Sequence, residues 1–193
     1  MIYLFRLTHM LKDESPSETT LKQCLLLLGA TDAQASLGGR QDTLNPEADW
    51  RWHFQSNVRD LPSSIQSDHG IESPWQLLHD LQQPAQQSGY SIALLPQEEN
   101  ASFESSGRVF SWPDDQPLDV AEFVTAFADC FAPDLLGFHL GYFPEEQGEE
   151  IVCVLMASEV ASRIRALLGD EFEENFVPLA ANRNAARFQS HNS

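Results

Sequence analysis

The chain has 193 residues, a length typical of one domain, and its 12 Phe and 4 Trp supply enough apolar side chain for a packed core. It is strongly acidic, with 29 Asp and Glu against 11 Lys and Arg and a net charge of −18. So negative a surface repels phosphate backbones and anionic lipids, which argues against nucleic-acid and membrane binding. No apolar run approaches the roughly 18 residues of a membrane-spanning helix, and the N-terminus lacks a signal-peptide pattern, so we expect a soluble cytoplasmic protein.

The first part of the chain predicts one capped helix and one strand. Ser15, Pro16 and Glu18 form a capping box with proline in the first turn, and the helix should run to Leu28. Residues 2–7 fit either a strand or a helix start. Residues 30–48 lack periodicity and predict a mobile loop. The segment Trp50–Gln55 alternates aromatic and polar side chains, which is typical of a half-buried strand with its aromatic face in the core.

The middle of the chain predicts a helix between two loops, followed by two short strands. Ser73 and Pro74 start the helix, Pro84 should break or kink it, and Gly89 ends it. Tyr90–Leu95 and Arg108–Trp112 are the predicted strands. Residues 59–72 and 97–106 are predicted to be loops, the second of them acidic.

The last part of the chain predicts two helices and a β-hairpin. Asp119 caps a helix that ends before Pro133, and a further helix should run from Glu159 to Leu168. Between them, 135–143 and 151–156 read as the paired strands of a hairpin, joined by an acidic loop. Because 151–156 is apolar on both faces, we expect it to be a central strand covered on both sides. A last strand is predicted over 176–179.

Together these elements predict an α+β fold, with a mixed or mostly antiparallel sheet packed against about four helices. We expect a single domain over residues 1–180 and a disordered tail over 181–193.

Recognisable cofactor and metal motifs are missing from the sequence. There is no G-x-G-x-x-G, no G-x-x-x-x-G-K-[ST], no H-E-x-x-H and no paired C-x-x-C. Cys24, Cys130 and Cys153 are widely spaced in apolar surroundings, so we expect three buried, reduced thiols. The sequence therefore predicts no cofactor and no metal.

His139 is the weak candidate for a catalytic residue. On a strand it shares a face with Gly137 and Gly141, which leaves room for a general base or a metal ligand beside the following glutamates. Equally, the glycines can admit a closely packed neighbour. Cys153, on the strand expected to pair with that of His139, could be a nucleophile only if its thiol were exposed, and its apolar strand argues against that. A small hydrolase or metal-dependent enzyme centred on His139 is accordingly the alternative reading.

The acidic segments of the second half carry the leading hypothesis. Residues 98–174 contain 18 acidic residues and three basic ones. If these carboxylates gather on one face, they form a binding surface for a basic protein. We therefore predict a non-enzymatic protein-interaction module of the inhibitor, immunity or adaptor type. Weak Ca²⁺ or Mg²⁺ binding by the same loops is a third possibility. The predicted binding residues are Glu98, Glu99, Asp114, Asp115, Glu145, Glu146, Glu149, Glu150, Asp170 and Glu171.

Overall fold

The computed structural model describes residues 15–37, 50–67, 73–95, 101–113, 118–140, 151–179 and 187–192. These residues form seven helices and eight strands, which confirms the α+β class but exceeds the predicted four helices. The helices are α2 (Glu18–Leu27), α3 (Asp32–Leu37), α4 (Trp50–Arg59), α5 (Pro74–Gln87), α6 (Val120–Asp129), α7 (Ser158–Leu168) and α8 (Glu171–Asn175). The strands are β1 (Ser64–Ser67), β2 (Ala93–Leu95), β3 (Ser102–Ser105), β4 (Arg108–Ser111), β5 (Leu135–Leu140), β6 (Ile151–Ala157), β7 (Phe176–Pro178) and β8 (Gln189–Asn192).

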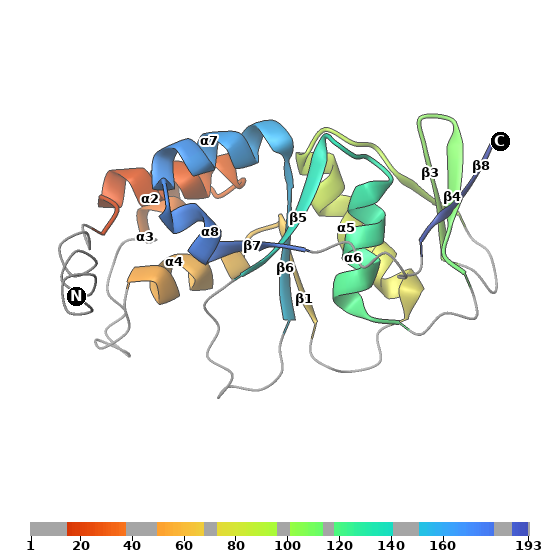
Figure 1. The fold of residues 1–193 in the computed structure, drawn as a ribbon, viewed down its shortest axis with the longest axis horizontal. Helices are drawn as coiled ribbons and strands as arrows, with labels where there is room; N and C mark the ends of the chain where they lie inside the picture. Colours follow the sequence, from red (N-terminus) through yellow and green to blue (C-terminus); the bar gives the residue numbers. More distant parts are fainter. Residues whose placement is uncertain are drawn as a thin grey trace, which may run out of the picture.

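The strands form two four-stranded sheets rather than one. The first sheet has the order β1-β6-β5-β7 and the second has the order β2-β3-β4-β8. Every pairing in both sheets is antiparallel, as the sequence predicted for most of the strands. Figure 1 shows α2, α3, α4, α7 and α8 on one side of the first sheet and α5 and α6 on the other, with the second sheet beyond them.

Strand β6 is the central strand that its sequence predicted. It lies between β1 and β5, and His139 of β5 is in register with Cys153 of β6. Val154 on one face belongs to the first hydrophobic core, whereas Cys153 and Leu155 on the other face belong to the second. Because successive side chains of a strand point to opposite faces, an all-apolar strand can only be buried by cover on both sides.

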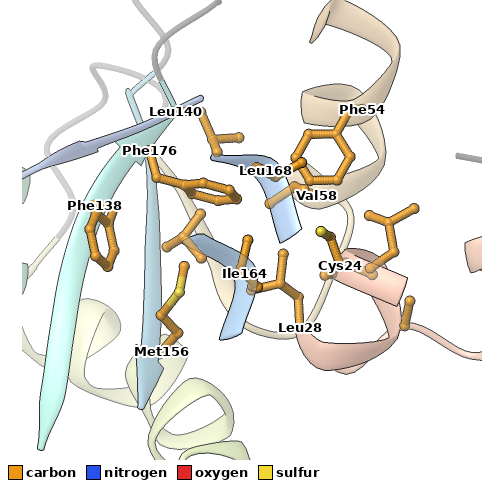
Figure 2. Packing of buried hydrophobic residues seen from close by; sticks show 14 of the residues in the cluster. Cys24, Leu28, Phe54, Val58, Phe138, Leu140, Met156, Ile164, Leu168 and Phe176 are labelled. Carbon is orange, nitrogen blue, oxygen red and sulfur yellow. The ribbon is translucent and has the colours of Figure 1, made fainter. Parts of the chain in front are cut away.

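The first core fills the space between the first sheet and its helices. Phe54 from α4, Cys24 from α2 and Ile164 from α7 converge on Phe138 and Phe176 of the sheet (Figure 2). The ring of Phe54 meets that of Phe176 edge to face, with centroids 6.1 Å apart. These contacts join segments that are more than a hundred residues apart in the chain, so this core depends on long-range packing.

The second core lies between the other face of the first sheet, α5, α6 and the second sheet. Phe103 of β3 is fully buried at its centre. Its ring lies within 5.0–5.4 Å, centroid to centroid, of those of Phe110, Phe127 and Phe188. The phenylalanines within the described residues therefore mainly serve packing, as the composition indicated.

Helix caps were the most reliable signals in the sequence. The side chains of Ser73 and Asp119 accept hydrogen bonds from the backbone N–H groups of Gln76 and Glu122, as predicted. The first helix is capped by Ser17 rather than Ser15. Pro84 lies buried inside α5 and does not end it. The hairpin, both later helices and the strands around 93–95, 108–111 and 176–178 are also confirmed.

The strand predicted at Trp50–Gln55 is wrong, because these residues form the start of α4. The alternation ends after six residues, and the burial follows helical spacing instead, with Phe54 and Val58 fully buried four residues apart. Gln55, predicted to face solvent, is fully buried and donates from Nε2 to Asn175 Oδ1 at 3.1 Å. Tertiary packing against α8 and β7 thus determines the helical conformation of this segment, although its short-range pattern favours a strand.

Three segments predicted to be loops contain regular structure. Helix α3 forms inside 30–48, β1 forms inside 59–72 and β3 forms inside 97–106. Of the predicted mobile loop, residues 38–48 lie outside the described residues, as do residues 2–7. Each missed element is short and gains its stability from its neighbours, which local patterns do not register.

The end of the chain differs from the predicted disordered tail. Gln189–Asn192 form β8, which pairs with β4, and Phe188 precedes it. The Phe188 ring lies within 5.2–5.4 Å of the rings of Phe103, Trp112 and Phe123. One aromatic residue in a polar segment was the only sequence signal for this docking.

Replacing Phe188 by alanine is expected to destabilise the chain by about 2 kcal/mol, because a partly buried ring leaves the second core. Chemical denaturation measures the change, and the exposed neighbour Gln189, replaced by alanine, serves as the matched control. If the two variants were equally stable, the tail would not be docked as described.

Candidate functional site

His139 lies on β5, facing the second core. Its Nδ1 is 4.0 Å from the Sγ of Cys153, the residue directly across on β6. Burial lowers the pKa of His139, and the carboxylate of Asp119 opposes that shift only in part. The imidazole is therefore neutral at physiological pH and contacts a thiol rather than a carboxylate.

The space beside Gly137 is filled by another segment of the chain. A side-chain Cβ placed on Gly137 would come within 2.8 Å of the Cδ1 of Leu179. The backbone N–H of Leu179 also donates to the carbonyl oxygen of Gly137 at 3.1 Å. This glycine thus admits a closely packed neighbour, and it does not open a pocket for a substrate. Gly141 lies outside the described residues.

Cys153 lacks the properties of a nucleophile. Its side chain is fully buried, and burial raises its pKa to about 12. The nearby Asp119 carboxylate raises the pKa further. A reactive cysteine needs an exposed thiolate with a lowered pKa, which is the opposite arrangement. The His139–Cys153 pair is therefore two neutral groups in contact.

None of the three cysteines should react with an alkylating agent in the folded protein near neutral pH. Burial raises the pKa of Cys24 and Cys130 to about 12 as well, so each thiol stays protonated. Mass spectrometry after treatment with iodoacetamide should detect the unmodified chain, and three added groups once the chain is unfolded in denaturant. Rapid labelling of Cys153 in the native protein would restore the catalytic reading.

A metal site finds no support within the part of the chain that the structure describes. There, no group of three or more His, Cys, Asp and Glu side chains is placed to hold a metal ion. His139 has Cys153 as its neighbour. The glutamates that follow it in the sequence, Glu145, Glu146, Glu149 and Glu150, lie outside the described residues.

Most of the predicted acidic binding residues also lie outside the described residues. These are Glu98, Glu99, Asp114, Asp115, Glu145, Glu146, Glu149 and Glu150. The structure places Asp170, exposed, directly before α8, and Glu171 in its first turn. That the acidic segments of residues 98–174 gather on one face therefore stays a prediction.

All three carboxylates of α8 form ion pairs with arginines of α4 or α7, although Glu173 and Glu174 remain exposed. Arg51 of α4 donates from Nε and Nη2 to the two carboxylate oxygens of Glu171 at 2.9 and 3.0 Å. Both side chains are mostly buried, with exposed fractions of 20% and 23%. Arg51 also pairs with Glu174, and Arg165 pairs with Glu173. This acidic run joins α8 to α4 and α7, a role that the sequence did not indicate.

A polar cleft of about 710 Å³ lies where α4, β1 and α5 meet. Arg59 and Asp60 line it from the end of α4, Ser64 and Gln66 from β1, and Asp80 from α5. Leu61, Pro62 and Ile65 also line it, but more of its exposed lining is polar than apolar, whereas small-molecule sites are mostly apolar. Its polar character therefore favours a ligand that is recognised through hydrogen bonds.

Sequence reasoning missed this cleft because it predicted a loop over 59–72 and so did not place β1 in the sheet. The sequence signal that was available is the repeated glutamine of α5, at Gln82, Gln83 and Gln86, all of which line the cleft. An amide-rich helix face is common on surfaces, so the signal alone does not identify a site.

Comparisons with known proteins provide no relative. No protein-family model, no curated protein and no solved structure matches this chain. No helix in the described ranges has the length and apolar character required to traverse a bilayer.

Proposed function

We propose that this protein is a non-enzymatic interaction module that binds a cationic protein partner. The observation that carries the proposal is the charge of residues 98–174, where 18 acidic residues stand against three basic ones. An inhibitor, an immunity protein or an adaptor fits this description equally, since each works by occupying a partner's surface. The proposal places the function in the surface charge and in the polar cleft, and not in a catalytic centre.

The physical basis is long-range electrostatics. A net charge of −18 on 193 residues creates a potential that attracts cationic surfaces from beyond contact distance and accelerates their encounter. Two of the three basic residues in the acidic region are engaged within the fold, Arg165 by Glu173 and Arg108 by stacking on the Phe110 ring. Their charges still count, and residues 98–174 keep an excess of 15 negative charges, 18 acidic residues less three basic ones.

The alternative, a small hydrolase or metal-dependent enzyme at His139, draws no support from the site. The imidazole contacts a buried thiol with a raised pKa, and Leu179 fills the space beside Gly137. General acid–base catalysis needs a titratable group within reach of a bound substrate. The interaction module is therefore the better conclusion.

Affinity capture from cell lysate at low and at high ionic strength tests the proposal. We expect a basic protein to be captured at low salt and to be lost at high salt, because screening shortens the reach of surface charges. The purified pair should then bind in a direct titration.

A variant with glutamine at Glu145, Glu146, Glu149 and Glu150 provides the matched comparison, because it removes four charges and keeps the side-chain shape. It should capture the partner more weakly than the wild type. If no basic partner were captured, or if capture were independent of salt, the proposal would be wrong.

A further inference from the structure

Strand β1 is an edge strand of the first sheet. Among the described strands it pairs only with β6, so one side of its backbone has no other described strand beside it. Figure 1 shows β1 at the border of this sheet, next to β6. An unpaired strand edge is a template for a further strand, which proteins commonly protect unless it has a function.

The register of the pairing identifies the backbone groups on the open side. The N–H of Leu155 donates to the carbonyl oxygen of Ser63 at 3.0 Å, so Ser63 directs its backbone toward β6. Because backbone direction alternates along a strand, Ile65 also faces β6, whereas Ser64 and Gln66 face the open side. The N–H of Ser64 is already bonded to the carbonyl oxygen of Leu61. Within the described part of the chain, the groups left for a further strand are the carbonyl of Ser64 and both backbone groups of Gln66.

The polar cleft borders this open edge. Ser64, Ile65 and Gln66 of β1 line it, with the end of α4 on one side and α5 on the other. The Gln66 side chain is held in place, since its Nε2 donates to the carbonyl oxygen of Arg59 at 2.8 Å and its Oε1 accepts from the Arg59 Nε at 3.1 Å. The edge is therefore a preformed channel with amide and carboxylate side chains along its walls.

The charge of the cleft and of the whole chain favours a cationic occupant. Asp60 is exposed at the cleft and Asp80 is half-buried in its wall. The guanidinium of Arg59 lies against the Gln66 amide. Side chains of an added strand alternate between the α4 wall and the α5 wall. Lysine or arginine at alternate positions would therefore face one wall and approach the carboxylate on it, Asp60 or Asp80, within the field of a chain of net charge −18.

We infer that the open edge of β1 binds an extended peptide segment that carries lysine or arginine, as a fifth strand of the first sheet. This inference rests on the proposed function, because it assigns the cationic partner a mode of binding and a site. Backbone hydrogen bonds to Gln66 and Ser64 supply the register, and the carboxylates in the cleft walls supply the preference for basic side chains.

The Gln66→Pro variant tests the inference by removing one backbone hydrogen-bond donor. Proline removes the N–H of residue 66, which faces the open side, and leaves the hydrogen bonds to β6 intact; proline is tolerated in edge strands for this reason. Gln66→Val is the matched control, because it loses the same side-chain bonds to Arg59 and keeps the N–H. Thermal unfolding of both variants verifies that they are folded.

The probe is a capped synthetic peptide of alternating lysine and threonine, titrated into the full-length protein and followed by NMR. We expect the amide signal of Gln66 to shift and its hydrogen exchange to slow. Gln66→Pro should weaken binding about tenfold relative to Gln66→Val, as loss of one backbone hydrogen bond predicts. A peptide with alternate backbone amides N-methylated should bind weakly, and so should one with serine in place of lysine.

Several results would overturn the inference. These are the absence of binding, shifts confined to another surface, equal binding of the N-methylated peptide, and equal affinity of Gln66→Pro and Gln66→Val. If the peptide with serine in place of lysine bound equally well, the predicted preference for a cationic peptide would be wrong. Should Gln66→Pro still capture a salt-sensitive basic partner from lysate as well as Gln66→Val does, the proposed function would stand and the β1 site would be wrong.

Discussion

The Phe54→Ala variant is expected to lose about 3–5 kcal/mol of stability, the usual cost of deleting a fully buried aromatic side chain. Phe54 has no exposed surface, and its ring meets those of Trp50 and Phe176 with centroids 6.5 and 6.1 Å apart. The truncation leaves a cavity where α4 meets the first sheet. Denaturant unfolding, followed by circular dichroism and by tryptophan fluorescence, measures the loss.

Trp52→Ala is the informative comparison for Phe54→Ala. On the strand predicted from sequence, Trp52 and Phe54 point to the same face and should contribute alike. On the helix, Trp52 is only half-buried, so its replacement should cost clearly less than that of Phe54. Equal losses of stability from the two substitutions would contradict the helical assignment of this segment.

The Phe103→Ala variant should lose a similar amount, about 3–5 kcal/mol, in the second core. The Phe103 ring is fully buried and lies within 6.0 Å, centroid to centroid, of the rings of Phe110, Phe127, Phe131 and Phe188. Through Phe127, the Phe103 ring packs β3 of the second sheet against α6. Denaturant unfolding again measures the change.

The next residue on the same strand, Glu104, is the control for Phe103. It is half-buried and directs its side chain to the opposite face of the sheet, so Glu104→Ala should change the stability by well under 1 kcal/mol. Should Phe103→Ala prove as mild as Glu104→Ala, the second core would not be packed as described.

The sequence predicted those elements whose signals are local. Ser73 and Asp119 identify helix starts because a short polar side chain is bound directly to the backbone N–H three residues later. The apolar run of β6 identified a strand covered on both faces, since an all-apolar strand requires that cover. In both cases the residues that carry the information are those that make the contact.

Prediction failed where contacts with residues far along the chain determine the conformation or the burial of a residue. Gln55 is buried in a helix because Asn175 accepts its hydrogen bond, 120 residues later, and six alternating residues carry no trace of that contact. Glu171 looked like a surface charge but binds Arg51 at the same sequence distance. Strand β1 and the cleft beside it exist because β6 pairs with a segment too short and too polar to be recognised alone.

In the candidate site, too, the features with a local sequence signal were predictable and those that depend on distant contacts were not. Burial of Cys153 was predictable from its apolar strand, and the raised pKa follows from that burial. The role of Gly137 as a place where another segment packs was one of the two possibilities in the sequence, and Leu179 decides between them. The open edge of β1, by contrast, can be identified only from the strand order and the register.

The most direct test of a charge-steered interaction module is the association rate constant with its captured partner, measured by stopped-flow fluorescence across a series of salt concentrations. The account predicts a rate that falls at least about tenfold from low to high ionic strength, because the −18 net charge accelerates encounter only while it is unscreened. An association rate that stays constant across the series would contradict it.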